Sequence, residues 1–217
     1  MDIIEAMKER HSVRQYEKKP LGEKAVTALC EEIMLCNKEG GLHIQLVTNE
    51  PKAFDCFMAH YGKFEGVTSY IALVGPKSGD LDEKCGYYGE RLVLKAQQLG
   101  LNTCWVAMSY SKTPGAFEIE NGEKLTAVIA VGYGKTKGVQ HKSKAPEEVS
   151  NVSSETPDWF RNGVEAALLA PTAINQQKFC FIYADGKVIA KAKTAFFSKL
   201  DLGIAKYHFE LGSGRKI

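Results

Sequence analysis

Two arginines and a serine lie close together in the stretch RHSVR, residues 10 to 14. Each guanidinium is a planar fork of N–H donors, and Ser12 adds a short hydroxyl donor between Arg10 and Arg14. This combination of charge and donors suits a phosphate dianion, so we interpret the stretch as a candidate phosphate-binding segment. A solvated charged turn has the same composition, and the residues alone leave both interpretations open.

A second basic cluster, HKSKAP, comes after an apolar run that ends in GYG. Lys142 and Lys144 could add two positive charges to an anion site. Taken alone, such a polar, lysine-rich stretch is the ordinary composition of an exposed surface loop.

The stretch APTAINQQKF, residues 170 to 179, places uncharged amides directly before an aromatic, strand-like run. A carboxamide both donates and accepts, so Asn175 and Gln177 could bind the edge of a heterocycle whose donors and acceptors alternate. The alternative is a polar loop that hydrogen-bonds its own backbone.

The elements that must position these residues can be predicted from apolar periodicity. Helices are expected at residues 2–10, 22–36, 87–99, 158–170 and 200–212. Strands are expected at residues 42–49, 69–75, 124–134 and 178–184. Residues 37–41 should break the second helix, Gly100 should cap the third, and residues 101–110 should lead towards a further short helix. This order indicates an α+β fold rather than strict βαβ repetition.

The composition narrows the class of protein. The chain has 217 residues, of which 44% are hydrophobic and 25% charged, and these values suit one globular domain. The net charge of +2 gives no reason to expect nucleic-acid or membrane partners. No apolar stretch reaches the roughly 20 residues that span a bilayer, and we expect a cytoplasmic protein.

The cysteine and histidine pattern gives no sign of disulfides or of a metal site. Six cysteines occur singly, mostly in apolar runs, so buried, reduced thiols are expected. No CxxC pair or histidine cluster has the spacing of metal ligands. His208 and Tyr207, on the last predicted helix, are interpreted as ordinary core or surface residues.

Four segments together resemble the nitroreductase family of FMN-dependent oxidoreductases. AMKERHSVRQYEKKPL is similar to the family's opening, where R-x-S-x-R follows the first helix and contacts the flavin phosphate. AQQLGLNTCWVA, AVIAVGYG and HKSKAP are similar to its G-L-G-T-C-W segment, its penultimate strand and its basic pair before a proline. The resemblance implies a nitroreductase-like fold, with a central, mostly antiparallel sheet flanked by helices. It also implies that FMN contacts Arg10, His11, Ser12, Arg14, Thr103, Cys104, Trp105, Lys142 and Lys144.

One family segment stands in an unusual place. APTAINQQKF is similar to the family's A-P-S-x-x-N-x-Q-P-W loop, which in common members follows the second helix, where this chain has CNKEGGLHIQ. Lys178 and Phe179 replace the family's Pro and Trp. The displacement resembles a smaller, Thermotoga-type branch, and it implies that the flavin ring is contacted by Pro171, Thr172, Asn175 and Gln177.

The displaced loop suggests how the chain is organised. Family members are homodimers in which one subunit binds the flavin phosphate and its partner supplies the loop. We therefore expect a single domain, residues 1–217, with a phosphate-binding half at 1–150 and a pseudo-partner half at 151–217. The order helix, break, strand occurs at both 22–48 and 158–184, which fits internal two-fold symmetry but is also common by chance. A pseudo-dimeric monomer is favoured, and a homodimer is the alternative.

The resemblance implies chemistry that needs no catalytic side chain, because flavin N5 accepts and donates the hydride. The expected reaction passes electrons from NAD(P)H to a small organic acceptor, such as a nitroaromatic compound or a quinone. No GxGxxG follows a strand, so NAD(P)H should share the flavin pocket as a diffusible co-substrate. The alternative is a non-catalytic flavin-binding or scaffold protein.

Overall fold

The computed structural model describes residues 1–217 and divides into two compact units. The first unit comprises residues 1–81 and 92–139, and the second comprises residues 82–91 and 140–217. A segment from the middle of the chain, residues 82–91, therefore belongs to the second unit. The expected halves at 1–150 and 151–217 stay a prediction. Whether the second unit acts as a pseudo-partner stays a prediction.

The first unit is built on a four-stranded antiparallel sheet in the order β1-β2-β4-β3. Its strands are β1 (Gln45–Val47), β2 (Tyr70–Pro76), β4 (Glu123–Gly132) and β3 (Asn102–Val106). Six consecutive residues are buried in each of the two central strands, which explains their continuous apolar runs. This sheet confirms the predicted α+β class.

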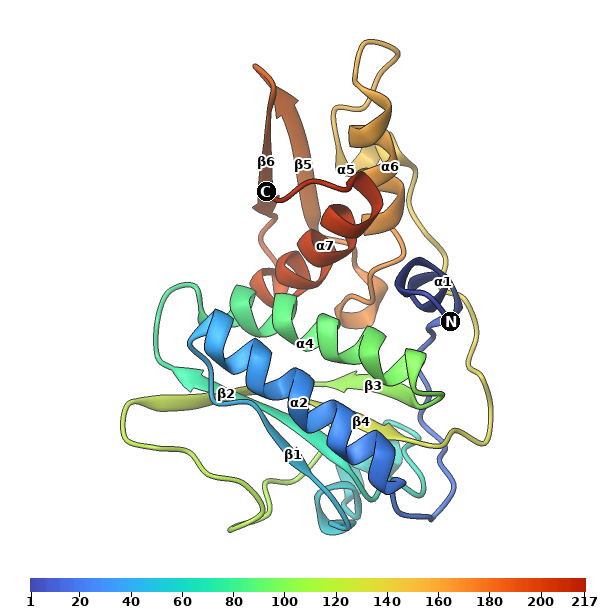
Figure 1. Ribbon diagram of the computed structural model, residues 1–217, viewed down its shortest axis with the longest axis vertical. Helices are drawn as coiled ribbons and strands as arrows, with labels where there is room; N and C mark the ends of the chain where they lie inside the picture. Colours follow the sequence, from blue (N-terminus) through green and yellow to red (C-terminus); the bar gives the residue numbers. More distant parts are fainter. The chain divides into compact units, whose positions relative to one another are not determined.

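Helices α1 (Ile3–Glu9) and α2 (Glu23–Gly40), the 3-10 turn η1 (Lys52–Phe54) and the short α3 (Phe57–Tyr61) complete this unit. Figure 1 shows α2 running along the sheet. No helix of the protein is both long and apolar enough to cross a membrane.

Two sequence predictions in this unit were wrong. Helix α2 continues through Asn37 and ends at Gly40, because the left-handed residue that closes it is Gly41, with a φ of +62°. The amide of Asn37 pairs with the backbone of Ile44: its Nδ2 donates to the carbonyl (2.9 Å) and its Oδ1 accepts from the N–H (2.7 Å). Asn37 therefore fastens the turn after the helix instead of ending the helix. Residues 101–110 do not lead to a short helix, because they contain β3, which pairs with β4.

Helix α4 (Leu81–Gln98) begins earlier than expected and contributes to both units. Its end is as predicted, since Gly100 has a φ of +76° and the Leu101 N–H bonds the Ala96 carbonyl at 2.9 Å.

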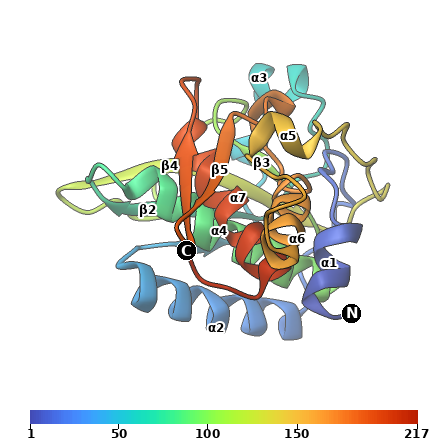
Figure 2. The same ribbon diagram turned by 90° about the horizontal axis from the view of Figure 1, so that it is seen from above.

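The second unit contains α5 (Pro146–Val149), α6 (Asp158–Ala167), η2 (Ala173–Asn175), β5 (Phe179–Ala184), β6 (Lys187–Ala192) and α7 (Ser198–Ser213). Strands β5 and β6 form a hairpin, and α6 lies beside α7 in both views (Figures 1 and 2). Buried phenylalanines fill the space between these elements, with the rings of Phe181 and Phe209 stacked at 4.6 Å. Strand β6 was not predicted.

Residues 82–91 of α4 pack against α7 at very short range within the second unit. A Cβ at Gly86 would lie 2.0 Å from the Leu200 carbonyl oxygen, and one at Gly203 would lie 1.9 Å from that of Glu83. The two helices can approach this closely only because neither position carries a side chain.

A buried ionisable pair joins the same two helices. Nε2 of His208 lies 2.8 Å from Oε1 of Glu90, and its Nδ1 lies 3.1 Å from the Ala166 carbonyl oxygen. Both side chains are completely buried. His208 is thus a core residue whose two ring nitrogens both have partners.

Candidate functional site

The candidate phosphate-binding segment, residues 10 to 14, runs from the end of α1 along strand β3. The Arg10 N–H closes the helix on the Ala6 carbonyl (3.0 Å), and the backbone then becomes extended. The Val13 N–H donates to the Thr103 carbonyl (3.0 Å), within a parallel bridge between Ser12 and Thr103. Residues predicted from two separate motifs are therefore neighbours in the first unit.

The side chains of this segment differ in burial. Val13 is buried, whereas Ser12 is half-buried and Arg14 is exposed. Arg10 is buried although it is charged, because only 4% of its surface is exposed. A guanidinium held this deeply is well placed for a charge-assisted contact, since screening by water is weak there.

Two arginine charges act on the buried Cys104 thiol of β3. Burial raises the pKa of this thiol, while the Arg14 charge, a hydrogen bond with Ser12 and the Arg10 charge each lower it. The pKa of His11 is lowered mainly by burial and to a smaller extent by the charge of Arg10. Positive potential thus extends from the segment to β3, where it would favour a bound anion. Trp105, the next residue on β3, is half-buried.

A glycine allows the loop after β4 to lie against the same segment. Gly138 has a φ of +72°, and a Cβ there would come within 2.8 Å of the His11 Cβ and 2.9 Å of the Ser12 carbonyl oxygen. Only glycine combines this backbone conformation with this close approach. The loop therefore supports the segment from one side.

The amide-rich loop of the second unit, residues 171 to 177, has a strained backbone. Ile174, Asn175 and Gln177 have φ values of +46°, +55° and +46°, and Ile174 is 96% exposed. A left-handed conformation is especially costly for a β-branched residue, so tertiary contacts must hold the loop in place.

Asp201 of α7 supplies two of these contacts. Its carboxylate accepts from the Ala173 N–H (3.0 Å) and from the side-chain amide of Gln176 (2.6 Å). Burial raises the pKa of Asp201 although both hydrogen bonds lower it. Sequence reasoning missed this residue, and no local pattern around it indicates the role.

Lys144 holds the loop from the other side. Its ammonium donates to the carbonyls of Gln176 (2.9 Å) and Gln177 (3.1 Å), and its N–H donates to Oε1 of Gln177 (2.9 Å). The amides of Asn175 and Gln177 both donate to the Lys142 carbonyl, at 2.8 and 2.9 Å. These contacts join the amide-rich loop to the segment at residues 142–144.

The predicted site residues therefore form two groups, each within one unit. The first unit holds Arg10, His11, Ser12, Arg14, Thr103, Cys104 and Trp105. The second holds Lys142, Lys144, Pro171, Thr172, Asn175 and Gln177. The basic pair was expected in the phosphate-binding half, but the first unit ends at Val139. Lys144 contacts the amide-rich loop through its ammonium and Lys142 contacts it through its carbonyl, and a role of either lysine in phosphate binding stays a prediction.

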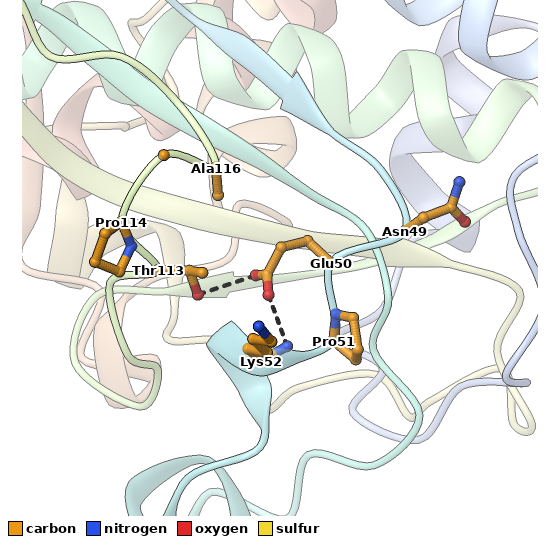
Figure 3. Close-up of a pocket in the computed structure, with 8 residues that line it drawn as sticks. Asn49, Glu50, Pro51, Lys52, Thr113, Pro114 and Ala116 are labelled. Atoms are coloured by element: carbon orange, nitrogen blue, oxygen red, sulfur yellow. Dashed lines mark hydrogen bonds between the residues drawn. The ribbon is translucent and has the colours of Figure 1, made fainter.

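A separate pocket of about 300 Å³ lies in the first unit and contains none of the predicted residues (Figure 3). Glu50 lines this pocket, and its carboxylate accepts hydrogen bonds from Thr113 Oγ1 (3.1 Å) and the Lys52 N–H (2.8 Å). The Ala53 N–H and the Tyr70 hydroxyl bond the same carboxylate. Glu50 thus joins η1 to the loop at residues 113–116, which is a structural role.

The sequence matches a family model described as "Putative TM nitroreductase" over residues 2–213. The chain belongs to this nitroreductase family, as the four sequence segments predicted. A search of curated proteins gives no match.

Solved structures show the same fold. A "putative nitroreductase" from Thermotoga maritima is 23% identical, with 98% of this chain and 83% of that chain covered and a TM-score of 0.67. A "putative nitroreductase in complex with fmn" from Desulfovibrio desulfuricans is 16% identical, with 72% and 99% covered and a TM-score of 0.55. A "Putative NADH dehydrogenase/NAD(P)H nitroreductase" from Parabacteroides distasonis is 21% identical, with 71% and 98% covered and a TM-score of 0.53.

Proposed function

We propose that the protein is an FMN-dependent oxidoreductase that passes electrons from NAD(P)H to a small organic acceptor, such as a nitroaromatic compound or a quinone. The observation that carries the proposal is the grouping of Arg10, Ser12 and Arg14 beside β3 in a chain of the nitroreductase family. The Desulfovibrio desulfuricans relative, whose structure contains FMN, supports the choice of flavin.

The residues of the first unit fit a flavin phosphate. The guanidiniums of Arg10 and Arg14 and the hydroxyl of Ser12 are all donors to an anion. The two arginine charges also oppose the rise that burial causes in the Cys104 pKa, which is the effect expected of a positive potential. When bound, FMN would supply hydride acceptance and donation. The chain's own task is to bind the phosphate, orient the ring and exclude competing reactions.

The amide-rich loop has a supporting role in this proposal. Lys144 and Asp201 hold it in a strained conformation, so it is preformed rather than ordered by the ligand. Because the amide donors of Asn175 and Gln177 already bond the Lys142 carbonyl, any flavin contact by these two residues would use their remaining hydrogen-bonding capacity.

Absorption spectroscopy tests the proposed function directly. Protein reconstituted with FMN should remain yellow after gel filtration, and NADH or NADPH under anaerobic conditions should bleach it. Adding a quinone or a nitroaromatic compound should restore the flavin spectrum. A yellow protein that neither nicotinamide bleaches would instead be a non-catalytic flavin-binding protein, and a protein that retains no FMN would refute both.

We also propose that one polypeptide supplies all the residues of one flavin site, as a pseudo-dimeric monomer. Mixing an Arg10→Ala variant with an Asn175→Gly variant under subunit-exchange conditions should then restore no tight FMN binding. Glycine suits this test because it removes the amide and tolerates the φ of +55°. Titration of the mixture with FMN, compared with each variant alone, measures the result.

The same experiment distinguishes an ordinary homodimer. If the loop served a neighbouring chain, a mixed dimer would contain one intact site, and tight binding would reappear for a fraction of the protein. Dilution provides a second comparison, because a shared site would lose flavin as the dimer dissociates, whereas a site within one chain would not. Recovered binding in the mixture would rule out the pseudo-dimeric monomer.

A further inference from the structure

Both peptide groups of Val13 are fixed by hydrogen bonds. On one side, its N–H donates to the Thr103 carbonyl at 3.0 Å. On the other side, its carbonyl accepts from the Tyr16 hydroxyl at 2.6 Å. Ser12 precedes Val13 and Arg14 follows it, so these two bonds set the backbone orientation on which both side chains depend.

Tyr16 is itself held firmly in the core of the first unit. Only 1% of its surface is exposed, and its N–H donates to the Glu65 carbonyl at 2.8 Å. Its ring lies against β4, because a Cβ at Gly132 would come within 3.0 Å of it. The hydroxyl is therefore delivered to the Val13 carbonyl by a ring with little freedom to move.

The Tyr16 hydroxyl keeps its proton and can therefore always donate a hydrogen bond. Burial raises the pKa of Tyr16 well above its ordinary value, so the group stays protonated throughout the physiological range. Its only other acceptor within range is the Ala130 carbonyl, at the longer distance of 3.5 Å. The Val13 carbonyl is the stronger partner of the two.

We propose that Tyr16 is a positioning residue for phosphate recognition: its hydroxyl fixes the Val13 carbonyl and thereby directs Ser12 and Arg14 towards the phosphate of the flavin. The inference rests on the proposed function. Tyr16 does not touch the ligand, and it acts through the backbone of the segment that does. Its loss should therefore affect ligands that carry the phosphate and spare those that lack it.

The test is the ratio of FMN affinity to riboflavin affinity, measured by quenching of flavin fluorescence. Tyr16→Phe removes the hydroxyl and keeps the ring. We expect FMN to bind about three- to tenfold more weakly, the range that corresponds to one net hydrogen bond, with riboflavin affinity unchanged. A general loosening of the core would weaken both flavins together.

Tyr70→Phe is the matched control. Tyr70 is also fully buried in the first unit, and its hydroxyl bonds the Glu50 carboxylate at 3.3 Å, in the pocket of Figure 3. This variant loses a buried tyrosine hydroxyl without touching the segment at residues 10–14. It should keep the wild-type ratio of affinities.

Gly132→Ala provides a second route to the same bond. Its added Cβ would lie 3.0 Å from the Tyr16 ring and should shift the ring and its hydroxyl by a few tenths of an ångström, so the affinity ratio should fall, but by less than in Tyr16→Phe. The inference is overturned if folded Tyr16→Phe protein keeps the ratio of affinities found in the unmodified protein. If Tyr16→Phe does not fold, an unchanged ratio in Gly132→Ala overturns it instead. The proposed function fails separately, if the unmodified protein binds neither FMN nor riboflavin.

Discussion

Arg10→Ala is expected to weaken FMN binding by at least about tenfold while changing riboflavin binding much less. Arg10 is almost completely buried at the end of α1, and its charge acts on Cys104 of β3. Losing a charge-assisted contact to a phosphate costs about 1.5 to 3 kcal/mol, and every 1.4 kcal/mol corresponds to a factor of ten in affinity. Calorimetric titration with the two flavins measures the difference.

Two further variants control for effects on folding. Arg14→Ala removes an exposed guanidinium from the same segment, so it should shift the affinity ratio in the same direction with less effect on the core. Arg161→Ala removes an arginine of the second unit that bonds the Ser153 carbonyl, and it should leave both affinities unchanged. An equal loss of FMN and riboflavin affinity in Arg10→Ala would contradict a phosphate contact.

The second large effect is expected on stability. His208→Ala should lower the free energy of unfolding by about 3 to 5 kcal/mol, because it leaves the buried carboxyl of Glu90 without its imidazole partner. The change also leaves a cavity between α7 and α6, which adds to the loss. Urea or guanidinium unfolding followed by circular dichroism measures the effect.

A double-mutant cycle separates the pair from the cavity. Glu90→Gln removes the ionisable group but keeps a side chain that can hydrogen-bond the imidazole, so it should cost less than His208→Ala. In the Glu90→Gln background, His208→Ala should cost clearly less than it does alone, because no carboxyl is then left buried. Equal costs in the two backgrounds would mean that the pair is energetically uncoupled.

Helices and strands could be predicted best where a single pattern of apolar residues extends over the whole element. Strands β2 and β4 appear in the sequence as continuous apolar runs because both are buried along most of their length. Strand β6 could not be found in this way, because its residues alternate between exposed and half-buried and none is fully buried. The role of Asn37 could not be predicted either, because its side chain bonds the backbone of Ile44, and the two residues meet only once the chain has turned.

Only part of the candidate site could be predicted, because only some of its residues are neighbours in the sequence. Arg10, Ser12 and Arg14 are close in the sequence, so their motif is visible in one short stretch. The sequence suggests Lys144 as a phosphate ligand but gives no sign that its ammonium bonds carbonyls more than thirty residues further along the chain. Tyr16 and Asp201 act by supporting other segments, and nothing in their immediate sequence reveals the partners that they hold.

Helix α4 has a consequence for any attempt to divide the protein. Because residues 82–91 belong to the second unit while the residues on both sides belong to the first, the chain passes between the units three times. No single cut in the gene can therefore separate them. A fragment ending at Val139 would carry Gly86 and Glu90 without Gly203 and His208, their partners on α7, and would expose a helix face that is built to be covered. A fragment starting at Gln140 would lack the opposite side of the same contact. We expect neither fragment to fold alone, so the two units must be produced together as one chain.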